Sequence, residues 1–213
     1  MTNPSLIASL CADLTPVSRT HVERQIAVAG LIGGGVSFAA LLSTLGIQSG
    51  LSSIAQMTPF GIKLGFAVSL AAVGFAALLK LARPDGIPKN IPQKAAAIFV
   101  LLASIALVQG GHVNNADDAK LLLGASWQSC SLRIAALSMP ITAMIGWAVR
   151  RQAPVHLRSA GAAVGMTSGA TAAALYALSC TESSSLFVLI WYSAGIALST
   201  AFGALLGPRF LRW

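Results

Sequence analysis

Apolar residues along this chain gather in long runs that short polar segments separate. A window of about 19 residues, close to the length of helix that crosses a bilayer, finds six such runs. They cover Ile26–Gly46, Ile62–Ala82, Ala95–Gly111, Cys130–Val149, Ser159–Ser179 and Leu186–Leu206. The third run is the shortest, because Gly110 and Gly111 end it early. The pattern predicts an all-α membrane protein with six transmembrane helices.

The composition supports this prediction. Of 213 residues, 55% are hydrophobic and only 9% are charged, which excludes an ordinary water-soluble globular protein. The first 25 residues are polar and contain Asp13 and Glu23, so no cleavable signal peptide is expected. We therefore expect two parts, a polar segment of residues 1–25 and a six-helix transmembrane domain of residues 26–213.

Basic residues alternate between rich and poor segments along the chain. Eleven of the 14 lie in the amino-terminal segment, the second and fourth connections and the tail: Arg19, Arg24, Lys80, Arg83, Lys89, Lys94, Arg150, Arg151, Arg158, Arg209 and Arg212. The other segments hold Lys63, Lys120 and Arg133. Because basic segments stay on the cytoplasmic side, both termini are predicted to be cytoplasmic, in the bacterial inner membrane. The net charge of +8 thus reflects topology, and no direct nucleic-acid partner is expected.

The predicted spans offer little material for catalysis or transport. Phosphate-binding loops, zinc-protease motifs and nucleophile elbows do not occur, so an enzyme is not expected. Ion-coupled transporters keep ionisable groups near the membrane midplane, whereas Arg133 lies about one turn inside the outer end of its span. It is interpreted as an interfacial anchor or a partner of Glu182 or Asp118. A small-solute or metal transporter remains the alternative function.

Glycines recur at intervals of four in three predicted spans, a spacing that lets helix backbones approach closely. They are Gly30 and Gly34, then Gly161, Gly165 and Gly169, then Gly203 and Gly207. Such faces form either dimer contacts or internal seams, and a compact chain of this size favours internal seams.

Aromatic residues also follow the predicted membrane depth. Trp127 and Tyr176 fall near outer ends of spans, and Trp147 and Trp213 fall near inner ends. This placement is typical of the aromatic belts at the two membrane surfaces.

Two of the three cysteines are predicted to share one depth at the outer face. Cys130 lies 20 residues from Arg150 and Cys180 lies 22 residues from Arg158, which places both thiols roughly 30 to 33 Å from the inner charges. The periplasm permits a disulfide, and a transition-metal or heavy-metal site could add the nearby groups His112, Asp117, Asp118 and Glu182. The alternative is that both thiols only fill space in the core. No other cofactor is expected.

The amino-terminal segment carries a short amphipathic pattern. Its apolar residues recur three or four apart and are Leu6, Ile7, Leu10, Leu14 and Val17. A helix with this pattern can lie on a membrane surface or dock in a protein groove, and its sparse positive charge favours the groove. A segment without fixed structure is the alternative, since isolated helices this short are marginal.

Two stretches together resemble the NrsF-type membrane anti-sigma factors of proteobacteria, which are negative regulators of an extracytoplasmic-function sigma factor. The stretch YALSCTESSSLFVLIWYSAGIALSTAFGALLGPRFLRW, from Tyr176 to Trp213, is similar to the end of that family. The opening LIASLCADLTPVSR resembles the family's start, with Asp13, Leu14, Pro16, Val17 and Arg19 in place. Cys130 and Cys180 fall where the family has its outer-face cysteines, although Ser179 stands where the family often has histidine, and Cys11 matches no family motif.

The resemblance implies a regulator that holds a sigma factor at the membrane, away from RNA polymerase. The partner-binding residues would lie within residues 1–25: Leu6, Ile7, Leu10, Asp13, Leu14, Val17 and Arg19. Sensing of heavy metal or reactive oxygen species would occur at Cys130 and Cys180. The expected partners are thus a sigma factor and the lipid bilayer.

Overall fold

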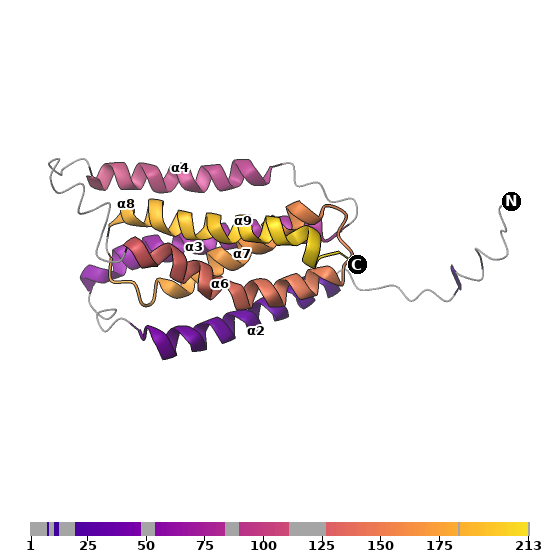
Figure 1. The fold of residues 1–213 in the computed structure, drawn as a ribbon. Coiled ribbons are helices and arrows are strands. Elements are labelled where there is room, and N and C mark those ends of the chain that lie inside the picture. Colours follow the sequence, from indigo (N-terminus) through magenta and orange to yellow (C-terminus); the bar gives the residue numbers. More distant parts are fainter. Residues whose placement is uncertain are drawn as a thin grey trace.

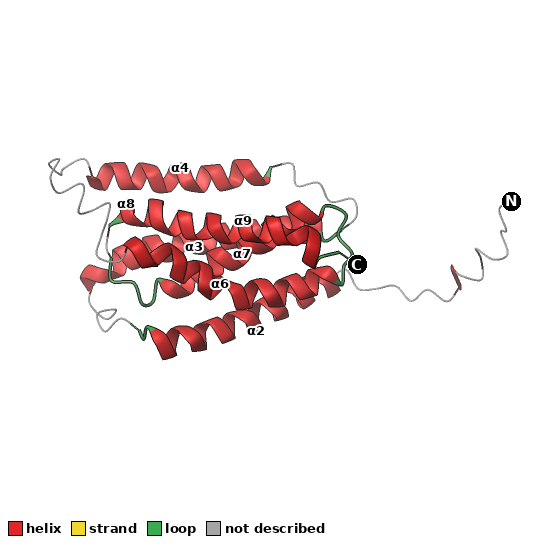
Figure 2. Ribbon diagram, viewed as in Figure 1, coloured by secondary structure: helices red, strands yellow, loops and turns green. Residues whose placement is uncertain are grey.

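A computed structural model of the chain describes residues 8, 11–12, 20–47, 54–83, 90–110, 127–182 and 184–212. All the regular structure in these ranges is helical, as Figure 2 shows. The elements in chain order are α2 (His21–Thr44), α3 (Ile54–Leu81), α4 (Ile91–Gly110), α6 (Trp127–Arg150), α7 (Leu157–Tyr176), α8 (Ser185–Phe187), η1 (Val188–Tyr192) and α9 (Ser193–Phe210). The last three follow one another directly, so α8, η1 and α9 form a single rod whose second part is a π-helical turn.

A long helix thus occupies each of the six regions where the apolar runs predict one. By length and composition, four are suited to cross a membrane: His21–Thr44, Thr58–Leu81, Ser129–Arg150 and Ser185–Phe210. In α4 the apolar part is shorter, Ile91–Ala106. The α7 helix is instead rich in Ala, Gly, Ser and Thr, and most of its residues are buried against other helices. A helix surrounded by protein does not need the apolar surface that lipid demands.

The helices run side by side along the bundle, with α7 near its centre (Figure 1). The α7 helix packs against α3, α6 and α9, while α2 packs mainly on α6. The α4 helix lies at the edge, where Phe66 and Phe99 hold it to α3 with ring centroids 5.5 Å apart. The beginning of α2 and the end of α9 lie at the same end of the bundle (Figure 1).

Glycine sets the closest helix contact, between α7 and α9. A Cβ atom at Gly161 would collide with the backbone of Gly203, and one at Gly165 would collide with the backbone of Ser199. A Cβ atom at Gly207 would likewise lie only 2.5 Å from the carbonyl oxygen of Leu157. The prediction of an internal seam is therefore confirmed for these two helices.

The glycine prediction is wrong in one detail for α2. A Cβ atom at Gly33 would lie 2.7 Å from the Cα atom of Ile141 on α6, whereas one at Gly34 would meet nothing within 4 Å. Gly33, and not Gly34, makes the tight contact, because the angular position of a residue around the helix axis decides whether it faces α6. A spacing of four from another glycine does not decide this. Gly30 lies about one turn earlier on the same face, where an added Cβ atom would lie 3.7 Å from the side chain of Ile145.

Candidate functional site

The two cysteines lie at the end of the bundle opposite the start of α2. Cys130 is in the first turn of α6 and is 0% exposed, and Cys180, four residues beyond the end of α7, is 3% exposed. Both are free thiols. The amide of Cys180 donates to the carbonyl of Tyr176 at 3.1 Å, which extends the end of α7 into the turn that carries the thiol.

The structure brings these two thiols into one buried group with Lys63, Tyr176 and Tyr192, which we name the cysteine cluster. Each cysteine interacts electrostatically with Lys63 and with the tyrosines, and the two interact with each other. Four separate elements contribute to the cluster, namely α3, α6, η1 and the end of α7 with its following turn. A change at the thiols therefore acts on the contacts between helices that are far apart in the sequence.

Lys63 anchors the cluster from α3. Its side chain is 4% exposed, and its Nζ atom donates a hydrogen bond to the carbonyl oxygen of Cys180 at 2.9 Å. It also interacts electrostatically with Glu182, two residues further along the same turn. A buried ammonium group is stable only when other groups satisfy its hydrogen bonds and charge. The position of the turn that carries Cys180 is thus tied to α3.

Two tyrosines form the wall of the cluster. The rings of Tyr176 and Tyr192 have centroids 6.0 Å apart and planes inclined by 49°. The side chain of Tyr176 interacts with Cys130 and with Arg133. The Tyr192 hydroxyl is fully buried and forms no hydrogen bond of good geometry within the described part of the chain. A buried hydroxyl in this state carries a desolvation cost that a change of its surroundings can relieve.

The π-helical turn η1 places Tyr192 in the cluster. A π turn adds a residue to the helix and frees a backbone carbonyl, and such turns are frequent at functional sites. Here the hydroxyl of Ser131, the residue after Cys130, donates to the carbonyl of Trp191 at 2.8 Å. A Cβ atom at Gly195 would lie 2.9 Å from the Cβ of Ile134. The irregular turn is therefore held directly against the part of α6 that carries Cys130.

Further polar contacts connect α6 to its neighbours toward the middle of the bundle. The hydroxyls of Ser138 and Ser199 join α6 to α9 at 2.9 Å, and those of Thr142 and Ser168 join α6 to α7 at 2.7 Å. Ser37 of α2 donates to the carbonyl of Leu137 at 2.7 Å. Each contact joins α6 to another helix inside the bundle. A displacement of α6 at the cysteine cluster would therefore disturb specific bonds along its length.

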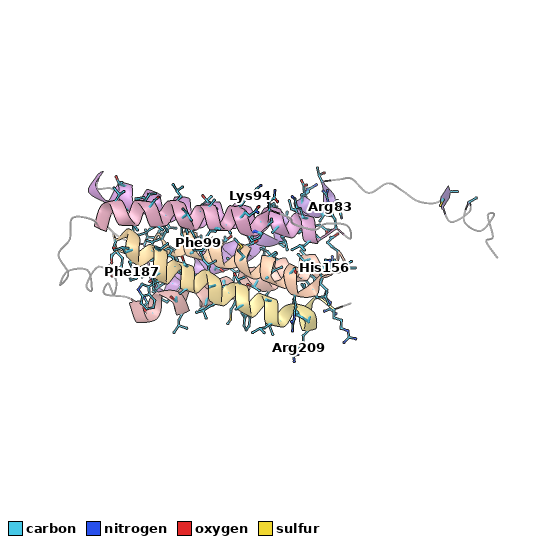
Figure 3. The ribbon with its side chains drawn as sticks, turned by 90° about the horizontal axis from the view of Figure 1, so that it is seen from above. Arg83, Lys94, Phe99, His156, Phe187 and Arg209 are labelled. Atoms are coloured by element: carbon cyan, nitrogen blue, oxygen red, sulfur yellow. The ribbon has the colours of Figure 1, made fainter. Side chains whose placement is uncertain are left out.

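The opposite end of the bundle is basic. Figure 3 shows Arg83, His156 and Arg209 at this end and Phe187 at the other. The other residues here include Arg150, Arg151 and Arg158, all exposed. Arg83 pairs with Glu23 at 3.7 Å. The segregation of basic residues predicted from the sequence is thus seen among the described residues.

Some predicted site residues fall outside the described part of the chain. They are Leu6, Ile7, Leu10, Asp13, Leu14, Val17 and Arg19 of the opening segment, and His112, Asp117 and Asp118 of the suggested metal ligands. Cys11 is described and exposed. The described residues hold no group of three or more His, Cys, Asp or Glu side chains suited to a metal ion.

The roles of Lys63, Tyr176 and Tyr192 in the cluster were not predicted from the sequence. Tyr176 is the last residue of α7, near the end of its helix as predicted, but it is only 2% exposed, so its interpretation as a residue of the surface aromatic belt is wrong. The ring packs in the protein core, where its hydroxyl interacts with Cys130 and Arg133. An aromatic ring with a polar partner is stable in the core, which explains why Tyr176 is buried. One signal was available for Lys63, since it is a lone cation inside an apolar run near the depth of both cysteines. Arg133 is exposed, as expected for an interfacial anchor.

Comparison with known proteins gives a consistent result over the whole chain. The family NrsF, described as "Negative regulator of sigma F", matches residues 10–213. A relative from Azospira oryzae named "Probable anti-sigma-F factor NrsF" is 34% identical over 215 residues, and one from Caulobacter vibrioides named "Anti-sigma-F factor NrsF" is 32% identical over 214 residues. Both matches cover 100% of each chain. No solved structure matches the chain.

Proposed function

This chain belongs to the NrsF family of negative regulators of sigma F, and from that membership we propose a membrane-bound anti-sigma factor controlled by its cysteine cluster. In this proposal the protein sequesters an extracytoplasmic-function sigma factor at the bacterial inner membrane. Heavy metal or oxidant at Cys130 and Cys180 then releases the sigma factor. The observation that carries the proposal is the full-length similarity to two anti-sigma-F factors, joined to the burial of both thiols in one cluster.

All six long helices span the membrane in this proposal. The burial of α7 among α3, α6 and α9 supports a span in spite of its small residues, because lipid does not contact it widely. The α4 helix has exposed Val100, Leu101 and Val108, which suit a lipid-facing edge. The basic end faces the cytoplasm by the positive-inside rule, so both termini are cytoplasmic and the cysteine cluster faces the periplasm.

Residues 1–25 bind the sigma factor in this proposal. The last five residues of this segment, 21–25, form the start of α2 at the basic end (Figure 1). The spacing of Leu10 and Leu14 provides an apolar stripe of the kind that docks in a protein groove. An alkaline phosphatase fusion after Trp213 tests the orientation, because it should be inactive if the carboxy terminus is cytoplasmic.

The chemistry of the signal is a change of state of two thiols. An oxidant such as a peroxide removes two electrons and two protons as Cys130 and Cys180 form a disulfide, and the peroxide is reduced to water. A soft metal ion instead displaces the two thiol protons and binds both sulfurs. Either product pulls the turn that carries Cys180 toward α6. Because Lys63 of α3 is hydrogen-bonded to the carbonyl oxygen of Cys180, movement of this turn also displaces α3.

The anti-sigma role is tested by co-purification. The solubilised full chain should retain a sigma factor, and a chain that lacks residues 1–25 should not. Leu10→Asp and Leu14→Asp should raise activity of the target promoter without stress, because a charge on the apolar stripe weakens docking. Ser9→Asp adds the same charge away from that stripe and serves as the control. Equal promoter activity in all of these strains at equal protein levels would contradict the assignment of the segment.

The sensing role has a separate test. Cys130→Ser and Cys180→Ser should abolish induction of the promoter by heavy metal or peroxide, whereas Cys11→Ser should leave induction intact. Serine keeps the size of the buried side chain, so the stability of the bundle should change little. Normal induction in both variants would disprove the sensor and leave the sigma-binding role standing.

A further inference from the structure

A groove between α2 and α6 lies at the basic end of the bundle, away from the cysteine cluster. It has a volume of about 390 Å³, and its lining includes Arg24, Val28 and Ile32 from α2, Met144 and Trp147 from α6, and Arg151, the residue that follows α6. Arg24 lies at the end of the proposed sigma-factor segment, but the lining residues among the described part of the chain include neither the apolar stripe of that segment nor the thiols. The groove therefore requires an explanation of its own.

The lining changes from cationic to apolar with depth on both helices. On α2, Ile32 lies eight residues beyond Arg24, and Met144 of α6 lies seven residues before Arg151, which directly follows that helix. At 1.5 Å per residue both pairs extend about 10 to 12 Å from the basic end into the bundle. The exposed Val28, at 45%, and Ile32, at 50%, form the apolar stretch. A ligand that fits both helices has an anionic head and a hydrocarbon tail.

The cations of the groove are available for such a head group. Glu23 and Glu182 are the carboxylates among the described residues, and Glu23 pairs with Arg83, while Glu182 lies at the opposite end. The guanidinium of Arg151 is positioned instead by the ring of Trp147, 3.8 Å from the ring centroid. Stacking on the ring leaves the N–H groups at the edge of the guanidinium free to bind a phosphate. Trp147 itself is 50% exposed, as expected for an indole at the membrane surface.

Hydrogen bonds fix the polar end of the groove. The Nε2 atom of Gln152 donates to the Oε1 atom of Gln25 at 2.8 Å, which joins the end of α6 to the start of α2. Gln25 also bonds His21 at 2.9 Å. The two helices are therefore held together at the point where the cations converge, so the groove is largely formed before a ligand enters.

We propose that this groove binds one anionic phospholipid of the inner leaflet, with its phosphate between Arg24 and Arg151 and an acyl chain along Val28, Ile32 and Met144. Basic pockets between helices on the cytoplasmic side suit such head groups. The inference rests on the membrane placement proposed above, which the fusion after Trp213 tests separately. An acidic segment of a protein would match the cations but would gain nothing from the deep apolar stretch.

The test uses the purified full chain in detergent and counts bound lipid by native mass spectrometry. Dioleoylphosphatidylglycerol should bind as a single molecule, and dioleoylphosphatidylcholine and inorganic phosphate should bind much more weakly. The double variant Arg24→Gln/Arg151→Gln should lower the affinity for phosphatidylglycerol by roughly tenfold or more. The control Arg158→Gln/Arg209→Gln removes the same charge from the same end and should bind as the parent does.

A second pair of variants tests the apolar part. Val28→Trp should fill the groove and reduce binding, whereas Leu31→Trp, at a position 76% exposed on the same helix, should not. Unfolding temperatures without added lipid show that each variant is folded. Equal lipid binding in the two arginine double variants would overturn the proposal. The proposal would also be overturned if Arg24→Gln/Arg151→Gln kept its bound lipid but lost the sigma factor. The groove would then be a docking site for protein.

Discussion

Lys63 at the cysteine end of the bundle and Arg83 at the basic end are held in opposite ways. At the cysteine end, Lys63 is 4% exposed and its ammonium is bonded to the carbonyl of Cys180. At the basic end, the Arg83 side chain is 60% exposed and reaches Glu23 only at 3.7 Å. Lys63 is therefore part of the packed structure, whereas Arg83 remains accessible to solvent, lipid or a partner.

This difference suits the proposed role, in which the protein reads one side of a membrane and responds on the other. A buried cluster changes its packing when one group changes, because every group depends on its neighbours. An exposed basic end can exchange partners at small cost, since each of its contacts contributes little. The predictions below test how strongly the two ends differ and what connects them.

The largest effect is expected where α7 and α9 connect the ends. Gly165→Leu should destabilise the protein by about 3 kcal/mol or more, because the new side chain meets the backbone of Ser199, which cannot move without separating the helices. Thermal unfolding in detergent measures the loss. Gly35→Leu on α2 faces open space and is the control. Equal unfolding temperatures for the two variants would mean that the seam does not hold the ends together.

Lys63→Met should have the next largest effect. It leaves the carbonyl of Cys180 without its donor in a buried site, at a cost of about 1 to 3 kcal/mol. Maleimide should then label Cys180 faster, since the turn that carries it is released from α3. Lys80→Met, an exposed position on the same helix, removes the same charge at the opposite end and should leave labelling unchanged. If both variants label alike, the ends do not differ as argued.

The positions of these helices follow from hydropathy, but their contacts do not. Apolar runs predicted a helix in all six regions, and α2 begins five residues before the predicted Ile26 because His21 to Gln25 extend the helix past the apolar core. Burial of Lys63 depends on how α3 is rotated toward the turn after α7, and a single helix pattern carries no such information.

The π-helical turn is a second feature beyond the reach of sequence patterns. The residues of η1 are Val, Leu, Ile, Trp and Tyr, which fit an ordinary apolar helix equally well. Two contacts with α6 accommodate the extra residue of the π turn. One is the hydrogen bond that the Ser131 hydroxyl donates to the carbonyl of Trp191, and the other is the close approach of Gly195 to Ile134. The placement of Cys130 and Cys180 at the same end of the bundle, in contrast, could be anticipated by counting residues from the basic connection, since regular helices convert sequence distance into length.

Ser131→Ala tests whether the π turn is part of the cysteine end. The carbonyl of Trp191 loses its donor from α6, so the free energy of unfolding should fall by about 1 kcal/mol. Ser69→Ala is the matched control, because the Ser69 hydroxyl is exposed and bonds the carbonyl of Gly65 in its own helix. A comparable small loss in both variants would show that η1 is held by its own helix and not by α6.

The smallest effect is expected at the basic end, for Glu23→Gln. The Glu23–Arg83 pair is 3.7 Å long, and its side chains are 45% and 60% exposed, so its loss should change the free energy of unfolding by at most about 0.5 kcal/mol. A double-mutant cycle with Arg83→Gln measures the interaction itself. A coupling as large as the loss in Lys63→Met would remove the contrast between the ends. A small coupling that disappears in high salt would support an open end whose charges are exchanged between partners.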